Sequence, residues 1–183
     1  MKPATVHYGS RRTAWGRVWV ALGDDGVLAV ALGSDPVGML SEDVRARRPS
    51  RLAHDLGATR ELLDDLERYL AGRNPKLVRW AIDPAGLSEF RYAVYEAARE
   101  VPYGSRVAYK ELARRIASAR HAHAVGTALA TNPFRLLGPD HRVILTRGAA
   151  GLSRLGRGWK GRLLALEAGQ VALDLPASEG RRA

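Results

Sequence analysis

Residues 109–130, YKELARRIASARHAHAVGTALA, hold the pattern that decides the fold of this chain. Apolar residues recur at helical spacing over 109–116, and a second helical pattern runs over about 120–130 until Asn132-Pro133 stops it. A break at Ser118 separates the two segments. Two short helices joined by a tight turn have the proportions of a helix-turn-helix motif. We therefore expect this motif in the second half of the chain.

The second of these segments is rich in small residues. Ala122, Gly126 and Ala130 follow one another at a spacing of four, so they form one stripe along a helix. Such a stripe is typical of close packing between helices, and it also permits close approach to a nucleic-acid backbone. The nucleic-acid interpretation is favoured by three basic side chains nearby, Arg114, Arg115 and Arg120.

The segments on either side of this motif predict further strands and helices. Upstream we expect two strands within 5–33 joined by an Asp-Gly hairpin turn, a loop with a short helix over 34–57, an amphipathic helix over 58–71 and a strand over 77–82. Elsewhere in the second half we expect a helix capped by Ser88, a strand at 143–145 and a final helix over about 159–168.

These elements predict a mixed α/β (α+β) protein with two domains. The first, residues 1–85, is a small strand-rich unit without a cluster of catalytic residues, and we expect it to have a structural role. The second, residues 86–170, is helical and contains the helix-turn-helix. Residues 171–183 end in the polar, basic sequence SEGRRA and are expected to form a flexible tail.

Composition and charge exclude several classes of protein. The 183 residues include no cysteine, which removes disulfides, thiolate-bound metals and cysteine nucleophiles. Apolar runs such as Val27–Leu32 are far shorter than the ~20 residues of a membrane-spanning helix, and the N-terminus lacks a hydrophobic signal core. Residues 101–183 contain 14 basic and 5 acidic side chains, whereas residues 1–100 contain 15 and 14. Nucleic acid is the expected partner, with an anionic membrane as the second alternative.

Two acidic groups stand in apolar surroundings. Asp140 adjoins His141 at the end of an apolar stretch, where burial perturbs ionisable groups. An isolated Asp-His pair is, however, usually a structural hydrogen bond. Glu167 lies in the run LLALEAG, where it is either an exposed helix-end carboxylate or part of a site. We expect no metal and no cofactor, since His121 and His123 are only two residues apart.

Four ordered segments carry a resemblance to a known family. VPYGSRVAYKELA, HAVGTALATNP, PDHRVI and GLSRLGRGWKGRLLALEAG together resemble the DNA-binding and active-site domain of the O6-alkylguanine-DNA alkyltransferases, over about 88–169. The strands near 15–32 and the segment LERYLAGRN resemble that family's N-terminal domain. The resemblance implies a helix-turn-helix that enters the minor groove and flips a base for chemistry, rather than one that reads sequence.

The resemblance also implies roles for individual residues. Tyr109 matches the tyrosine that presses on the phosphate beside the target nucleotide and helps to rotate it out of the stack. Asn132, His141 and Glu167 match a hydrogen-bond network around the reactive residue. The other base-pocket positions are Pro139, Val143, Ser153 and Arg154. The implied DNA contacts are Arg114, Arg115, Arg120, Ala122, Gly126, Thr127, Ala130 and Arg142.

The chain departs from the family pattern at the positions that matter most. Asp140 occupies the place of the acceptor cysteine, so alkyl transfer to sulfur is chemically impossible. His123 stands where the family has the arginine that fills the vacated stack, and Ser153 and Arg154 replace a tyrosine and a serine that face the base. The sequence therefore resembles the cysteine-less, alkyltransferase-like members, which bind alkylated guanine and mark it for excision repair.

Two functions remain open. The first is a DNA-repair protein that flips a damaged purine and recognises it without alkyl transfer. The alternative is a DNA glycosylase in which Asp140, with His141 and Glu167, excises the flipped base. Alkyl transfer to Asp140 is disfavoured because a carboxylate is a much poorer nucleophile than a thiolate. A sequence-specific regulator is disfavoured because the second helix presents alanine, glycine and threonine to the DNA.

The expected partner is double-stranded DNA that carries a damaged purine. Downstream excision-repair proteins are further expected partners, and no membrane is involved. We expect a monomer located in the cytoplasm, in association with the nucleoid. Whether the chain is an enzyme stays open at this point, because recognition and excision require the same pocket.

Overall fold

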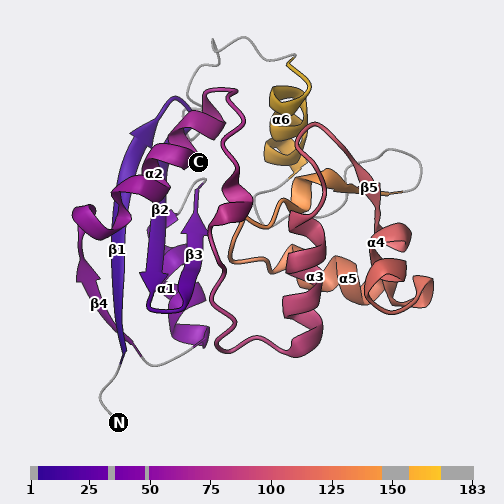
Figure 1. The fold of residues 1–183 in the computed structure, drawn as a ribbon, viewed down its shortest axis with the longest axis horizontal. Coiled ribbons are helices and arrows are strands. Elements are labelled where there is room, and N and C mark those ends of the chain that lie inside the picture. The colour runs from indigo at the N-terminus through magenta and orange to yellow at the C-terminus, as the bar shows by residue number, and fades with distance from the viewer. Residues whose placement is uncertain (1–3, 33–35, 48–49, 146–156, 170–183) are drawn as a thin grey trace, which may run out of the picture.

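The computed structural model describes residues 4–32, 36–47, 50–145 and 157–169 (Figure 1). The N-terminal half is a four-stranded sheet with a helix on each face, and the C-terminal half is a group of helices (Figure 1). This arrangement confirms the mixed α/β fold that the sequence predicts. No helix in these ranges is both long and apolar enough to cross a bilayer.

The sheet has the strand order β3-β2-β1-β4. Its strands are β1 (Ala4–Thr13), β2 (Gly16–Gly23), β3 (Gly26–Ala31) and β4 (Ser50–His54). Strand β2 pairs antiparallel with β1 and β3, whereas β4 runs parallel to β1. Gly26 begins β3 with a φ of 134°, and a Cβ there would lie 2.5 Å from the carbonyl oxygen of Ala81. Glycine is therefore required at this turn.

The sequence prediction for this half was incomplete. The hairpin between β2 and β3 is present as expected, but β1 precedes it as a third strand. Only Val6 and Gly9 of the ten β1 residues are buried, so this strand lacks the alternation of apolar residues on which the prediction depended. Strand β4 was missed within the segment expected to be a loop. Its residues are all exposed or half-buried, because it is the edge strand.

Two helices cover opposite faces of the sheet. Helix α1 (Pro36–Arg47) packs through Leu40 and Val44 onto one face, and α2 (Leu56–Leu70) packs through Leu62 and Leu66 onto the other. The α2 helix agrees with the predicted amphipathic helix, whereas α1 is longer than the short helix expected. The strand expected over 77–82 is wrong. A single 3₁₀ turn and an isolated β-bridge replace it, because only Ile82 meets a neighbouring strand.

The C-terminal half contains the predicted helix-turn-helix. Its elements are α3 (Glu89–Arg99), β5 (Val107–Ala108), α4 (Tyr109–Ile116), α5 (Ala122–Ala130), β6 (Val143–Ile144) and α6 (Arg157–Glu167). A 3₁₀ turn, Ala119–His121, joins α4 to α5. Strands β5 and β6 pair in parallel with Val107 opposite Val143. This pair brings Tyr109, the first residue of α4, close to the turn that precedes β6.

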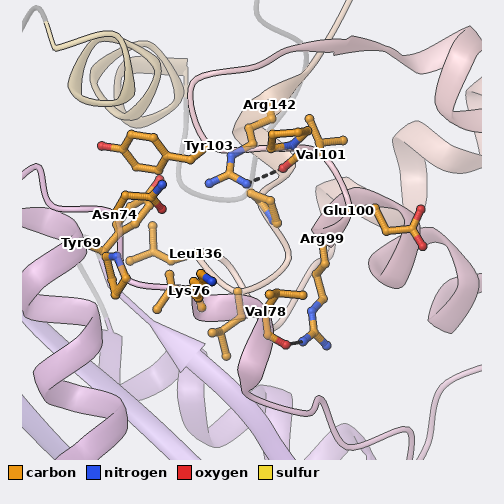
Figure 2. Close-up of a pocket in the computed structure, with 15 residues that line it drawn as sticks. Tyr69, Asn74, Lys76, Val78, Arg99, Glu100, Val101, Tyr103, Leu136 and Arg142 are labelled. Atoms are coloured by element: carbon orange, nitrogen blue, oxygen red, sulfur yellow. Dashed lines mark hydrogen bonds between the residues drawn. The ribbon is translucent and has the colours of Figure 1, made fainter.

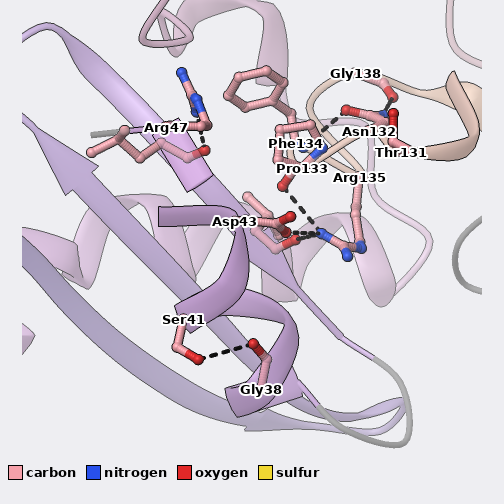
Figure 3. Close-up of polar contacts among 12 residues, drawn as sticks. Gly38, Ser41, Asp43, Arg47, Thr131, Asn132, Pro133, Phe134, Arg135 and Gly138 are labelled. Carbon is pink, nitrogen blue, oxygen red and sulfur yellow. Dashed lines mark hydrogen bonds and ion pairs between the residues drawn. The ribbon is translucent and has the colours of Figure 1, made fainter. Parts of the chain in front are cut away.

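The loop after α5 fastens the helical half to the sheet (Figure 3). The Arg135 guanidinium is buried and donates to the Val30 carbonyl oxygen at 2.8 Å and to the Asp43 carboxylate at 3.1 Å. The Pro133 carbonyl oxygen accepts from the Val30 amide at 2.8 Å. The guanidinium of Arg47 lies 4.9 Å from the centre of the Phe134 ring. These contacts fix the loop immediately before Asp140.

The Arg135 contacts predict a large effect on stability. Replacing Arg135 by Met leaves the Asp43 carboxylate buried without this arginine, and we expect a loss of about 3–5 kcal/mol in the free energy of unfolding. In the double variant Arg135→Met/Asp43→Leu the buried Asp43 carboxylate is removed as well, so part of the loss should be recovered. Urea unfolding measures the free energy of unfolding of the single and the double variant against the wild type. Equal losses in the single and the double variant would contradict a role for the ion pair.

Candidate functional site

A single 3₁₀ turn, Asp140–Arg142, carries two of the ionisable residues that the sequence singled out, Asp140 and His141. The turn lies between the loop that contacts the sheet and strand β6. The three residues are 4%, 1% and 8% exposed, so all of them are buried. The turn therefore brings an acid, an imidazole and a guanidinium into the protein interior.

The Glu167 carboxylate, at the end of α6, is the centre of a polar network. His141 Nε2 lies 2.7 Å from Glu167 Oε1, and Arg142 contacts both carboxylate oxygens at 2.9–3.1 Å. The Gly104 amide donates to Glu167 Oε2 at 2.9 Å. Glu167 is therefore buried and hydrogen-bonded, and it is not an exposed helix-end carboxylate.

These donors determine the charge of Glu167. Burial alone would raise the pKa of its carboxyl group, but the hydrogen bonds and positive charges of His141 and Arg142 lower this pKa to about 2. The carboxylate is consequently ionised at neutral pH. An ionised carboxylate only accepts hydrogen bonds, so each of its neighbours must present a proton to it.

Tyr69 joins this network from the N-terminal half, and sequence reasoning missed it. Its hydroxyl donates to Glu167 Oε1 and lies 3.0 Å from His141 Nε2. The apolar spacing in α2 assigned Tyr69 to the core. A buried tyrosine usually finds a partner for its hydroxyl, which is the signal that could have indicated a polar contact.

Asp140 lies on another side of the turn, near Tyr109 and Lys160. Burial first, and the charge of Asp140 second, raise the pKa of Tyr109 to about 12. Burial lowers the pKa of Lys160, and the Asp140 charge opposes this effect. The Lys160 ammonium donates to the Val143 carbonyl oxygen at 2.6 Å and to the Tyr109 hydroxyl at 3.4 Å. Asp140 therefore has a buried phenol and a buried cation in its electrostatic surroundings.

Asn132 organises the loop that leads to Asp140. Its side chain donates to the Gly138 carbonyl oxygen at 2.5 Å and accepts from the Phe134 amide at 2.9 Å (Figure 3). These are contacts to the backbone of the loop, and the described hydrogen bonds do not extend from Asn132 to Glu167. The predicted pocket residues Pro139 and Val143 are buried. Two further predicted pocket residues, Ser153 and Arg154, lie outside the described residues.

The helix-turn-helix presents a basic outer surface. Arg114, Arg115 and Arg120 are exposed, as are the α5 residues His123 and Thr127. The small-residue stripe Ala122, Gly126 and Ala130 is half-buried. A Cβ at Gly126 would lie 3.8 Å from the Tyr109 ring, so the stripe and the tyrosine are neighbours.

The predicted DNA contact of Arg142 is contradicted by its position. Its side chain is buried, because its guanidinium binds Glu167 and also donates to the Val101 carbonyl oxygen at 2.6 Å. In Figure 2 the guanidinium turns toward Val101. Arg142 thus neutralises a buried carboxylate instead of contacting a phosphate.

A pocket of about 300 Å³ adjoins the network (Figure 2). Tyr69, Tyr103 and Arg142 line it together with the segments 74–78 and 99–102. The Tyr103 ring meets the Tyr69 ring edge to face, with 5.7 Å between the centres. Within the described residues, no group of three or more His, Asp and Glu side chains is placed to hold a metal ion.

Comparison with known proteins identifies the family. Residues 89–169 match the family model "6-O-methylguanine DNA methyltransferase, DNA binding domain". A methylated-DNA–protein-cysteine methyltransferase of Methanothermobacter thermautotrophicus is 34% identical over 152 residues, which are 83% of this chain and 78% of that protein. A DNA base-flipping protein of Thermus thermophilus is 42% identical over 86 residues, which are 47% of this chain and only 57% of that protein.

Solved structures agree with these matches. The crystal structure of Mycobacterium tuberculosis OGT in complex with DNA has a TM-score of 0.72 and 26% sequence identity, covering 90% of this chain and 94% of that chain. This chain thus has the fold of an alkyltransferase with a DNA-binding domain. It belongs to the family of the methylated-DNA–protein-cysteine methyltransferases, which confirms the family resemblance seen in the sequence.

The lowered pKa of Glu167 predicts how acid affects stability. A carboxyl group whose pKa is depressed on folding stabilises the protein above its unfolded pKa, near 4.5, and this stabilisation is lost as the pH falls toward 2. Between pH 5 and pH 2 the wild type should therefore lose about 3 kcal/mol relative to Glu167→Gln. Unfolding free energies measured across this range test the prediction. Parallel pH curves for the two proteins would contradict it.

Proposed function

We propose that this chain is a cysteine-less, alkyltransferase-like DNA-repair protein. It binds the minor groove through α4 and α5, flips a damaged purine into the pocket beside Asp140 and recognises it there without alkyl transfer to cysteine. One observation carries the proposal. The buried His141–Glu167 pair of the site is intact, whereas the residue next to it is an aspartate in a chain without any cysteine.

The helix-turn-helix supports binding to DNA. Three exposed arginines flank the motif, and the small residues of α5 leave a shallow surface at which a sugar-phosphate backbone can approach. Tyr109 begins α4 beside Gly126, and the family resemblance gives it the role of pressing on a phosphate and rotating a nucleotide. The name of the base-flipping relative from Thermus thermophilus supports flipping as the action of this motif.

The chemistry of Asp140 supports recognition. Its carboxyl group can hydrogen-bond to the edge of a purine, but it is a poor nucleophile toward an alkyl carbon. Transfer of an alkyl group would, in addition, give an ester that water can hydrolyse. The pocket thus retains the surroundings of an alkyltransferase site without its acceptor. Recognition would then leave the lesion in place for excision-repair proteins, which are the proposed downstream partners.

The glycosylase hypothesis receives no support from the names of the relatives described above. A direct assay still separates it from recognition. Duplexes that carry O6-methylguanine or hypoxanthine are incubated with the wild type and with Asp140→Ala, treated with alkali and examined for strand breaks. We expect intact strands with both proteins. Breaks that require Asp140 would show excision and overturn the proposal of recognition alone.

Base flipping by Tyr109 is testable by substitution. Tyr109→Ala should weaken binding to an O6-methylguanine duplex by about tenfold, because the energetic cost of unstacking is no longer offset. Its affinity for the undamaged duplex should change by less than about threefold, because the exposed arginines dominate that binding. Competition binding at fixed salt measures both affinities. Tyr109→Phe, which keeps the ring, is the matched control and should remain close to the wild type. Unchanged lesion selectivity in Tyr109→Ala would contradict the proposed function.

A further inference from the structure

Tyr69 links the sheet half to the polar site. It lies in the last turn of α2, 72 residues before His141 in the chain. Its side chain is fully buried, and burial raises the pKa of its hydroxyl well above 10, so the hydroxyl remains a proton donor. Within the described part of the chain, Tyr69 is the only residue of the sheet half that hydrogen-bonds to Glu167.

The hydrogen bonds around Glu167 determine where the His141 proton lies. The 2.7 Å contact between His141 Nε2 and Glu167 Oε1 requires a proton on Nε2, since an ionised carboxylate cannot donate one. The Tyr69 hydroxyl gives its proton to the same carboxylate, so its oxygen can only accept from Nε2. The Nε2–H group of His141 therefore has two acceptors, Glu167 Oε1 and the hydroxyl oxygen of Tyr69.

The other ring nitrogen of His141 is left with a different role. His141 is 1% exposed, and its Nδ1 has no hydrogen-bond partner among the described residues. A buried nitrogen without a partner is destabilising, and such atoms are found at functional sites.

We propose that Tyr69 is a positioning residue of the site. Its hydroxyl holds the Glu167 carboxylate and the Nε2–H of His141 together, so that the imidazole keeps one orientation, with Nδ1 on the ring edge that faces away from Glu167. The N-terminal half is therefore not only structural, as the sequence suggested, but also holds His141 and Glu167 in place. The His141 signals can be measured without DNA, whereas the effect on lesion binding rests on the proposed function.

The ring packing of Tyr69 can be separated from its hydroxyl. The Tyr69 and His141 rings meet edge to face, with 6.5 Å between their centres, and a phenylalanine would keep this contact. Tyr69→Phe therefore removes only the hydrogen bonds. Tyr103→Phe is the matched control, since this tyrosine packs against Tyr69 and lies 5.7 Å from the Arg142 guanidinium, but its hydroxyl has no described hydrogen bond.

The first measurement is ¹⁵N NMR of the histidine side chains at neutral pH, with the His141 signals assigned by their loss in His141→Gln. In the wild type and in Tyr103→Phe we expect the same His141 signals, those of an Nε2–H group held by two acceptors. In Tyr69→Phe the Nε2–H signal should move and exchange faster with water, because this group then has one acceptor instead of two. Unchanged shifts in a folded Tyr69→Phe would overturn the proposal.

The wild type offers a test that needs no variant. The Tyr69 hydroxyl proton should exchange slowly with water and show a nuclear Overhauser effect to the Nε2–H of His141. If the wild type showed no Overhauser effect between these two protons, the proposal would also be overturned, even if Tyr69→Phe failed to fold.

Lesion binding then tests the consequence for function. Tyr69→Phe should bind a lesion-containing duplex about five- to tenfold more weakly than Tyr103→Phe, with equal affinity for undamaged DNA. Altered His141 signals with unchanged lesion affinity would overturn the link between Tyr69 and the pocket. A wild type that binds damaged and undamaged DNA equally would instead overturn the proposed function, and the NMR result would stand.

Discussion

The buried carboxylate of Glu167 is the constraint on which the site depends. An isolated charge at this depth would be strongly destabilising, and it is tolerated because cationic and neutral donors surround it. These donors come from the turn before β6, from the loop after α3 and from α2. Helix α6 can therefore complete the site only when the sheet and the helical half are correctly joined, which the buried Arg135 secures from the other side of the Asp140 loop.

The site combines a retained network with a changed reactive position. His141, Glu167 and Arg142 form a preorganised group of hydrogen bonds, and such groups serve recognition as well as chemistry. Asp140 adds a carboxyl group near the Lys160 ammonium, where the family resemblance places a cysteine. A pocket of this kind can bind a base firmly through polar contacts and still lack an acceptor for its alkyl group. This combination is the physical basis of the recognition function proposed above.

Much of this account was accessible from the sequence, and the exceptions have physical causes. The helix-turn-helix was predictable because its periodicity and its Asn132-Pro133 stop are local signals. Strand β1 was not, because it is a largely polar segment with only two buried residues, and pairing with β2 and β4 makes it a strand. The inward turn of Arg142 and the contact of Tyr69 with Glu167 depend on residues distant in the chain. No local pattern distinguishes such an arginine from one that binds phosphate.

The fate of a labelled methyl group tests the central claim most directly. A duplex with O6-[methyl-¹⁴C]guanine is incubated with an excess of the wild type or of Asp140→Cys, and the label is then measured on the protein, in the DNA and as free base. We predict that the label stays in the DNA with the wild type and moves to the protein in Asp140→Cys, because the His141–Glu167 pair next to position 140 is intact. Label on the wild-type protein, or released as free base, would contradict recognition without transfer or excision.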